Sequence, residues 1–150
     1  MSTVRVSYGL PRKGVPGPGS FRTWSDAVLR SRREDAEVSI RVVDAEEGRA
    51  LNLKYRHKDY ATNVLSFVAA YPDGVGADLL GDLVICAPVV AREAKEQAKP
   101  VDHHYAHLTV HGVLHLLGFD HETVAEARAM EAVERQVLEK LGVPDPYSER

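Results

Sequence analysis

The chain has 150 residues, of which 44% are hydrophobic, so it can form one domain with a real core and is not disordered overall. Cys86 is the only cysteine, so the chain cannot form an internal disulfide, and neither a signal peptide nor an apolar run of the roughly 18 residues that span a membrane is present. Residues 1–60 carry 12 Lys and Arg against 8 Asp and Glu, whereas residues 61–150 carry 7 against 14. Such asymmetry indicates either a polyanion-binding face or two solvated surfaces of opposite sign, and alone it favours the second. We expect a soluble cytoplasmic protein with no membrane partner.

The first half of the chain predicts two strands and two helices. Apolar and polar residues alternate over residues 4–8 and again over 38–42, as in half-buried strands. Residues 9–19 are rich in Pro and Gly and form a loop, after which Ser20 is placed to cap a helix. That helix would bury Phe21, Trp24 and Val28.

A second helix should follow Asp44 and Glu47, which have the spacing of an N-terminal capping box, and run to about Tyr55. Residues 64–68 and 79–86 then predict two strands joined like a hairpin by a turn over residues 71–77. Pro88 suits the first turn of a helix that ends near Gln97.

Two more helices are expected near the C-terminus. Residues 105–117 should be helical, with Gly118 as a left-handed cap. Thr123 and Glu126 form a capping box before a helix whose apolar face is Met130, Val133, Val137 and Leu141, and Gly142 and Pro144 stop it. The predicted fold is α+β: one domain over residues 1–150, with a small mixed four-stranded sheet covered by about five helices.

Three histidines near the C-terminal end of the fourth helix predict a metal site. His111 and His115 are four residues apart, so they share one face of a helix and can reach the same ion. His107 lies on nearly the same face but about 12 Å along the axis from His115, too far to share a tetrahedral centre with both. His121 can join them, because Gly118 lets the chain fold back. We predict that His111, His115 and His121 bind one divalent metal ion per chain.

The ligand set predicts a catalytic metal. Structural zinc sites usually fill all four positions with protein ligands, whereas catalytic sites keep one for water or substrate. Three imidazoles without a nearby thiol fit the second class. Zinc is the expected ion, although nickel, copper or iron would also accept imidazole.

The spacing of His111, His115, Gly118 and His121 is also that of metzincin metalloproteases. In that pattern a glutamate follows the first histidine and acts as the general base. Gly112 occupies this position and cannot take a proton, and no Met-turn is recognisable. Peptide hydrolysis by that mechanism is therefore disfavoured, but it stays an alternative.

Several further residues have a structural interpretation. Cys86 ends an apolar strand and is expected to be a packed small residue. His103, His104 and His107 are expected to face solvent or cap the start of the helix. Asp120 would either orient a ligand imidazole as a hydrogen-bond acceptor or cap the turn after Gly118.

The segment from His111 to His121, HGVLHLLGFDH, resembles the signature of the bacterial YbeY-type endoribonucleases, including glycine at position 112. The likeness covers roughly residues 38–147. It departs at Ala61, where the family commonly has proline, and at Val68-Ala69, where it usually has Pro-Phe. Four further blocks also match the family: LNLKYRHKD (51–59), TNVLSF (62–67), LGDLVIC with EAKEQ (80–86 and 93–97), and DPY (145–147).

This resemblance implies a zinc-dependent, single-strand-specific endoribonuclease, a hydrolase of RNA phosphodiester bonds. It implies a role in ribosome biogenesis: maturation of the 3′ end of 16S rRNA, and ribosome quality control. The expected partners are single-stranded regions of ribosomal RNA and the ribosome or small-subunit proteins. It also implies that Arg56 matches an arginine needed for activity.

Arg56 suits this role, because a guanidinium offers a planar fork to two phosphate oxygens and keeps its charge. Its alternative is an ion pair with Asp59. For the reaction we predict that the metal activates a water or polarises a phosphoryl oxygen while Arg56 stabilises the developing charge. No general base is evident, so water or the RNA 2′-OH is the nucleophile. A non-catalytic assembly factor whose metal only stabilises the fold is a further alternative.

Overall fold

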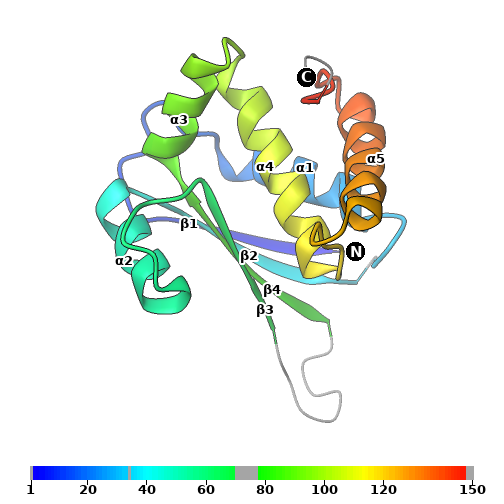
Figure 1. The fold of residues 1–150 in the computed structure, drawn as a ribbon, viewed down its shortest axis with the longest axis horizontal. Coiled ribbons are helices and arrows are strands. Elements are labelled where there is room, and N and C mark those ends of the chain that lie inside the picture. The colour runs from blue at the N-terminus through cyan, green and yellow to red at the C-terminus, as the bar shows by residue number, and fades with distance from the viewer. Residues whose placement is uncertain (1, 34, 70–77, 148–150) are drawn as a thin grey trace.

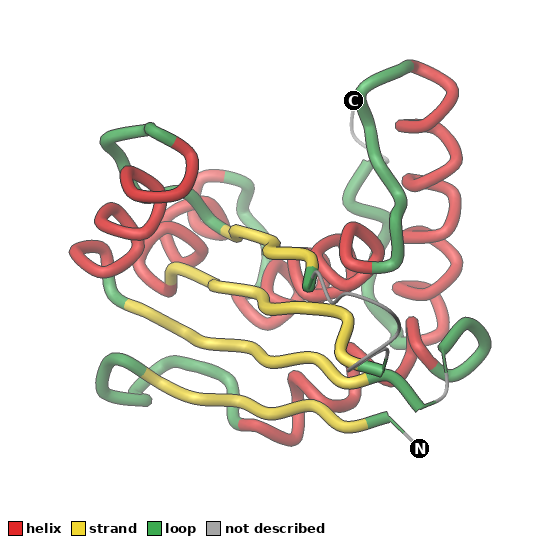
Figure 2. Tube along the Cα trace, turned by 90° about the horizontal axis from the view of Figure 1, so that it is seen from below, coloured by secondary structure: helices red, strands yellow, loops and turns green. Residues whose placement is uncertain are grey.

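A computed structural model describes residues 2–33, 35–69 and 78–147. Its sheet has the order β1-β2-β4-β3, with β1 (Thr3–Tyr8), β2 (Glu37–Val43) and β4 (Leu79–Cys86) parallel and β3 (Val64–Val68) antiparallel to β4. Figures 1 and 2 show these strands and the helices around them. The prediction of a mixed four-stranded sheet with a β3–β4 hairpin pairing is confirmed. The turn predicted over residues 71–77 lies outside the described residues.

Helices cover both faces of the sheet. They are α1 (Pro18–Leu29), α2 (Ala45–Arg56), α3 (Ala87–Glu96), α4 (Val101–Leu116) and α5 (Val124–Lys140). The larger core lies between one sheet face and α1, α4 and α5, and includes Leu83 and Ile85 of β4. Val84 and Cys86, which point to the other face, pack in a smaller core beneath α2. The α+β fold with five helices within the described residues is therefore as predicted.

Helix α4 is the central element of the larger core. From His104 to Leu116 its residues are buried, except for three half-buried histidines at positions 107, 111 and 115. These histidines are four residues apart, so they form one stripe along the helix. The side of the helix next to this stripe packs closely on the sheet at Gly112, where an added Cβ would lie 2.8 Å from Cδ2 of Leu83. From His104 onward, burial thus orients the helix and leaves only its histidine stripe accessible.

Two predicted helix starts were wrong. Helix α1 begins at Pro18 after Gly17, with no side-chain cap, so Ser20 is already inside the helix. Proline suits this first turn because its N–H would have no helical partner there. Helix α4 begins at Val101, four residues before the expected start, with Pro100 at its N-cap position.

The expectation that His104 and His107 face solvent was also wrong. Because α4 starts early, His104 lies in the core with 3% of its surface exposed, and its Nε2 lies 2.8 Å from Oε1 of Glu93. His107 is half-buried, and its Nε2 lies 3.1 Å from the hydroxyl of Tyr147.

Other local predictions are confirmed. Thr123 and Glu126 form a complete capping box at the start of α5. For α2 only half of the predicted capping box forms: Asp44 accepts the N–H of Glu47, but the side chain of Glu47 binds Arg41 instead of the backbone of Asp44. Cys86 is buried, and burial raises the pKa of its thiol. Within the described ranges, no helix combines the length and the apolar character that crossing a membrane requires.

The close approach at Gly112 generates a stability prediction. Gly112→Ala should destabilise the protein by about 1–3 kcal/mol, because the new methyl group meets the fully buried Leu83 and outweighs the better helix propensity of alanine. Urea unfolding measures the change. Gly19→Ala in α1 is the matched control, since nothing lies within 4 Å of a Cβ built there. Equal stability of the two variants would show that α4 is not packed tightly at this point.

Candidate metal centre

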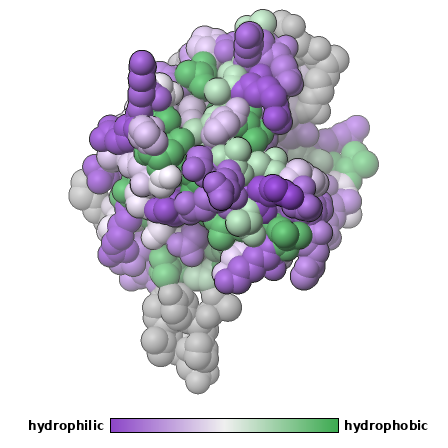
Figure 3. Space-filling view, turned by 90° about the vertical axis from the view of Figure 1, so that its left-hand side faces the viewer, coloured by the Kyte–Doolittle hydropathy of each residue, from purple (hydrophilic) through white to green (hydrophobic). Residues whose placement is uncertain are grey.

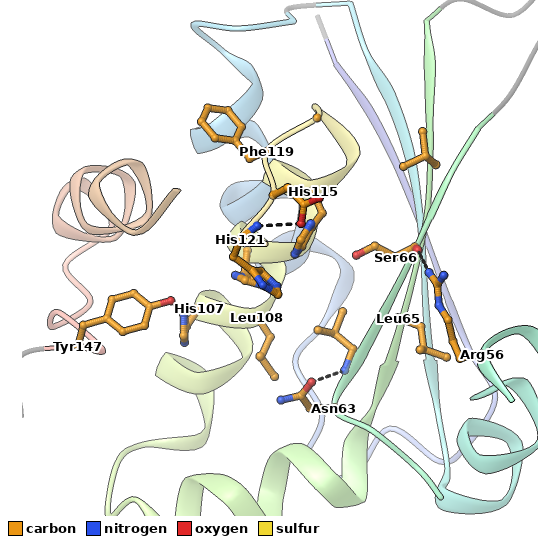
Figure 4. Close-up of a pocket in the computed structure, with 15 residues that line it drawn as sticks. Arg56, Asn63, Leu65, Ser66, His107, Leu108, His115, Phe119, His121 and Tyr147 are labelled. Atoms are coloured by element: carbon orange, nitrogen blue, oxygen red, sulfur yellow. Dashed lines mark hydrogen bonds between the residues drawn. The ribbon is translucent and has the colours of Figure 1, made fainter. Parts of the chain in front are cut away.

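Three histidines meet at the C-terminal end of α4 (Figure 4). His111 and His115 come from the accessible stripe of the helix, and His121 comes from the segment that follows it. One nitrogen from each ring lies within 4.8 Å of the nitrogens offered by the other two. The ring centroids are 4.7 Å apart for His111 and His115 and 5.0 Å apart for His115 and His121. The structure thus brings together the three residues that the sequence grouped.

A chain reversal at Gly118 places His121. The backbone of Gly118 has φ +103°, a left-handed conformation that glycine adopts without strain. The N–H groups of Gly118 and Phe119 bind the last carbonyls of the helix, at His115 and Leu114. Asp120 then accepts the backbone N–H of His121 at 2.8 Å. Asp120 therefore fixes the turn, one of the two roles considered for it.

The donor set fits a divalent cation. Imidazole binds zinc, copper, nickel or iron only through an unprotonated nitrogen. Burial lowers the pKa of His115, and the neighbouring His111 and His121 lower it further. His115 is therefore biased toward the neutral form that can donate a lone pair. This group of side chains could hold a metal ion.

The triad lines a cavity of about 660 Å³ between α4 and the edge strand β3. Figure 4 shows His115 and His121 on one side of this cavity and Ser66 and Arg56 on the other. The three-histidine group thus faces space that a substrate can enter. The wall opposite the histidines includes Arg56, Val64, Ser66 and Val68.

Arg56 ends α2 at the rim of this cavity. Its Nη2 donates to the carbonyl oxygen of Ser66 at 2.7 Å, and its Cζ lies 5.4 Å from the centre of the Phe67 ring. Asp59, the alternative partner considered for Arg56, instead binds Arg49 at 2.6 Å. The guanidinium is exposed, so it is tethered at one nitrogen while other N–H groups stay accessible.

A polar network fixes the start of β3 against α3 and α4. Glu93 accepts a hydrogen bond from Asn63 Nδ2 at 3.0 Å and binds Nε2 of His104 at 2.8 Å. Asn63 also accepts the N–H of Val64 at 2.6 Å. Burial lowers the pKa of His104, although Glu93 opposes this shift, so the ring is biased toward a neutral donor. The network sets how far β3 lies from the histidine stripe.

Sequence reasoning missed one buried carboxylate beside the triad. Glu134 of α5 is fully buried and binds both Nδ1 of His111 and the hydroxyl of Tyr147. Burial alone would raise its pKa, but the interactions of the carboxylate with His107, His111 and Tyr147 outweigh burial and lower the pKa to about 2. The available signal was a charged residue four positions from both Met130 and Leu138, on the buried face of the predicted helix.

The sequence as a whole decides the family. Residues 19–142 match the family described as endoribonuclease YbeY. The chain belongs to this family. A Stenotrophomonas maltophilia protein named endoribonuclease YbeY is 62% identical in an alignment 149 positions long, which covers 97% of this chain and 92% of the relative. A YbeY relative from Xanthomonas campestris is 60% identical with the same coverage.

The YbeY fold is also matched at low sequence identity. The solution structure of a Thermotoga maritima protein superimposes with a TM-score of 0.60 at 21% identity, over 99% of this chain and 100% of the other. This likeness shows the fold alone. It supports the arrangement of sheet and helices described above.

The network at His104 predicts a pH dependence of stability. Because the pKa of His104 is lowered in the folded state, the unfolded chain binds the proton first as the pH falls below about 6.5, and stability is lost. Urea unfolding at pH 7.5 and 5.5, with a chelator present, should show a smaller loss for His104→Gln than for wild type. His103→Gln is the control for removing an imidazole from the same turn. An identical loss in wild type and His104→Gln would contradict the assignment.

Proposed function

We propose that this chain is a zinc-dependent, single-strand-specific endoribonuclease that acts on ribosomal RNA in the cytoplasm. Its role would be maturation of the 3′ end of 16S rRNA and ribosome quality control, in contact with the ribosome or small-subunit proteins. The observation that carries the proposal is the three-histidine cluster that faces Arg56 across one cavity, in a chain of the YbeY family.

His111, His115 and His121 would hold the metal. Nδ1 of His111 is engaged by Glu134, so Nε2 is the nitrogen left for the ion. A zinc ion bound there supplies a Lewis acid for phosphodiester cleavage. The site has an open side that a substrate can reach, because the three histidines border the cavity and are not enclosed in the core.

Arg56 would bind the phosphate and stabilise its developing charge. Ser66 occupies one nitrogen of the guanidinium, and the rest of the planar fork can donate to phosphate oxygens. The carbonyl of Ser66 also holds the group at the cavity rim, so little rotamer entropy is lost on binding. Donors fixed in this way act on charge that develops during the reaction without having to reorganise.

The cavity favours a single strand over a duplex. A volume of about 660 Å³ is that of a small-molecule site and accommodates a nucleotide unit. Sequence-specific and enzymatic recognition of RNA commonly targets unpaired nucleotides, whose bases and backbone can enter such a site.

The metalloprotease alternative loses support from the structure. Its general base would stand at position 112, where even a Cβ lies 2.8 Å from the buried side chain of Leu83. Among the described residues that line the cavity, Asp120 is the one carboxylate, and it holds the turn before His121. The nucleophile is therefore water or the RNA 2′-OH, and a 2′,3′-cyclic phosphate on the product would identify the second.

The experiment that tests the function combines metal analysis with RNA cleavage. Purified wild type should contain about one zinc per chain and cleave unstructured RNA faster than a duplex of the same sequence. His115→Ala should lose both the metal and the cleavage, because two imidazoles hold zinc poorly. Cleavage that persists in His115→Ala would assign the activity to a contaminating nuclease, and a stoichiometric metal in that variant would remove His115 from the ligand set.

Arg56 gives a second test. Arg56→Ala should lower kcat/KM for RNA about 100- to 1,000-fold, and Arg56→Glu should abolish cleavage, because the charge that meets the phosphate is lost or reversed. Zinc content should stay that of wild type. Arg49→Ala is the matched control, since Arg49 lies on the same helix but binds Asp59. Loss of zinc in Arg56→Ala would show instead that Arg56 is structural.

Complementation distinguishes the proposed enzyme from a non-catalytic assembly factor whose metal only stabilises the fold. In a deletion strain, His111→Ala should fold but fail to restore normal processing of ribosomal RNA. Restored processing would mean that the metal and the catalysis are dispensable for the role of the protein.

A further inference from the structure

We propose that Glu134 is a positioning residue that fixes the tautomer of His111, and that Tyr147 holds its carboxylate in place. The C-terminal segment would then contribute to metal binding without providing a ligand. This inference rests on the metal site of the proposed function, but its first test does not require a metal.

The carboxylate of Glu134 lies where only one tautomer of His111 can donate a hydrogen bond to it. It is fully buried, and one oxygen binds Nδ1 of His111. An ionised carboxylate only accepts hydrogen bonds, so Nδ1 must carry the proton. Nε2 then carries the lone pair. A carboxylate partner of this kind also fixes the plane of the ligand ring.

Burying a charge is costly, so the partners of Glu134 have to replace the hydrogen bonds that water would donate to its carboxylate. The second oxygen accepts the hydroxyl of Tyr147, and Nε2 of His107 lies 3.7 Å from that same oxygen. Replacing a whole buried polar group of this kind, carboxylate and partners together, by well-packed apolar residues is often neutral for stability. The placement of this carboxylate is therefore better explained by what it does to His111 than by a contribution to the fold.

Tyr147 is held by contacts to two helices. Its ring packs edge-to-face on His107 of α4 at 5.4 Å and lies beneath the guanidinium of Arg135 of α5, also at 5.4 Å. Its backbone N–H binds Asp145, whose side chain binds Arg135 at 3.1 Å. These contacts leave the hydroxyl directed at Glu134, as a donor that keeps the carboxylate pointing toward His111.

A second metal site is the competing explanation of the same residues. One ligand atom from each of His107, His111 and Glu134 lies within 4.8 Å of the others. However, Nδ1 of His111 and the carboxylate already share a hydrogen bond, and the hydroxyl of Tyr147 occupies the other oxygen. We therefore assign this group to hydrogen bonding, and two zinc ions per chain in a titration would overturn the assignment.

The direct test is the tautomer of His111 in the metal-free protein. Long-range ¹H–¹⁵N correlation at pH 8 should show His111 with its proton on Nδ1 in wild type and a tautomer mixture in Glu134→Ala. Glu139→Ala, on an exposed position of the same helix, should leave the spectrum unchanged. A wild-type His111 that carries its proton on Nε2 would overturn the proposal even if the enzyme cleaves RNA.

The functional readout is the affinity of the protein for zinc, measured by competition with a chromophoric chelator. Kd should rise about 10- to 100-fold in Glu134→Ala, and Glu134→Gln should recover part of the loss because its amide oxygen still accepts the proton of Nδ1. A folded Glu134→Ala with the wild-type Kd would refute the positioning role but leave the proposed function intact. A wild type that binds no zinc would instead refute the metal site itself.

Tyr147→Phe keeps the test informative if Glu134→Ala fails to fold. It removes one hydroxyl and retains the ring contacts with His107 and Arg135. The zinc Kd should rise severalfold, and Tyr60→Phe, at a tyrosine that is 54% exposed, is the control. An unchanged Kd in a folded Tyr147→Phe would show that the C-terminal segment does not support the site.

Discussion

The contact between α4 and the sheet is the constraint on which the rest of the structure depends. Gly112 lets the helix approach β4 so closely that a single methyl group would meet Leu83. With that side packed, one stripe of the helix remains accessible, and histidines occupy it at positions 107, 111 and 115. The direction in which His111 and His115 point therefore follows from core packing. The same glycine stands where a metalloprotease needs its general base, so the packing also limits the chemistry that this helix can support.

Two carboxylates connect α4 to the neighbouring elements that line the cavity. Glu93 of α3 binds His104 and Asn63, and so ties the start of β3 to α4. Glu134 of α5 binds His111 and Tyr147, and so ties the C-terminal segment to the same helix. In both cases a histidine of α4 meets a carboxylate from a neighbouring helix. One pair ties α4 to the wall that carries Arg56, and the other holds His111, one of the three proposed metal ligands.

The features predicted correctly from the sequence are those set by residues close together in the chain. Alternation identified the first two strands, the Thr123–Glu126 capping box identified the start of α5, and the histidine spacing with Gly118 grouped three residues that the structure brings together. The start of α4 was wrong because Pro100 and the polar residues after it look like a loop, and His104 was assigned to solvent for the same reason. The interpretation of Arg56 as a functional residue came from family resemblance, since spacing alone favoured an ion pair.

Features that depend on contacts between residues distant in the sequence could not be predicted from these local patterns. The parallel order of β1, β2 and β4 depends on how the helices pack between them. Glu134 is 23 residues from His111, and Tyr147 is 13 residues further on. A charged residue on an apolar helix face indicates that a partner exists, but only the fold shows that this partner is a histidine of the cluster.

X-ray absorption at the zinc edge of the loaded protein tests the central claim most directly. The expected spectrum has three imidazole nitrogens at about 2.0–2.1 Å, recognised by the outer-shell scattering of their rings, and one further oxygen ligand without that scattering, which is the signature of a site with a position open to solvent or phosphate. A fourth ligand from the protein, or fewer than three imidazoles around the ion, would contradict the account.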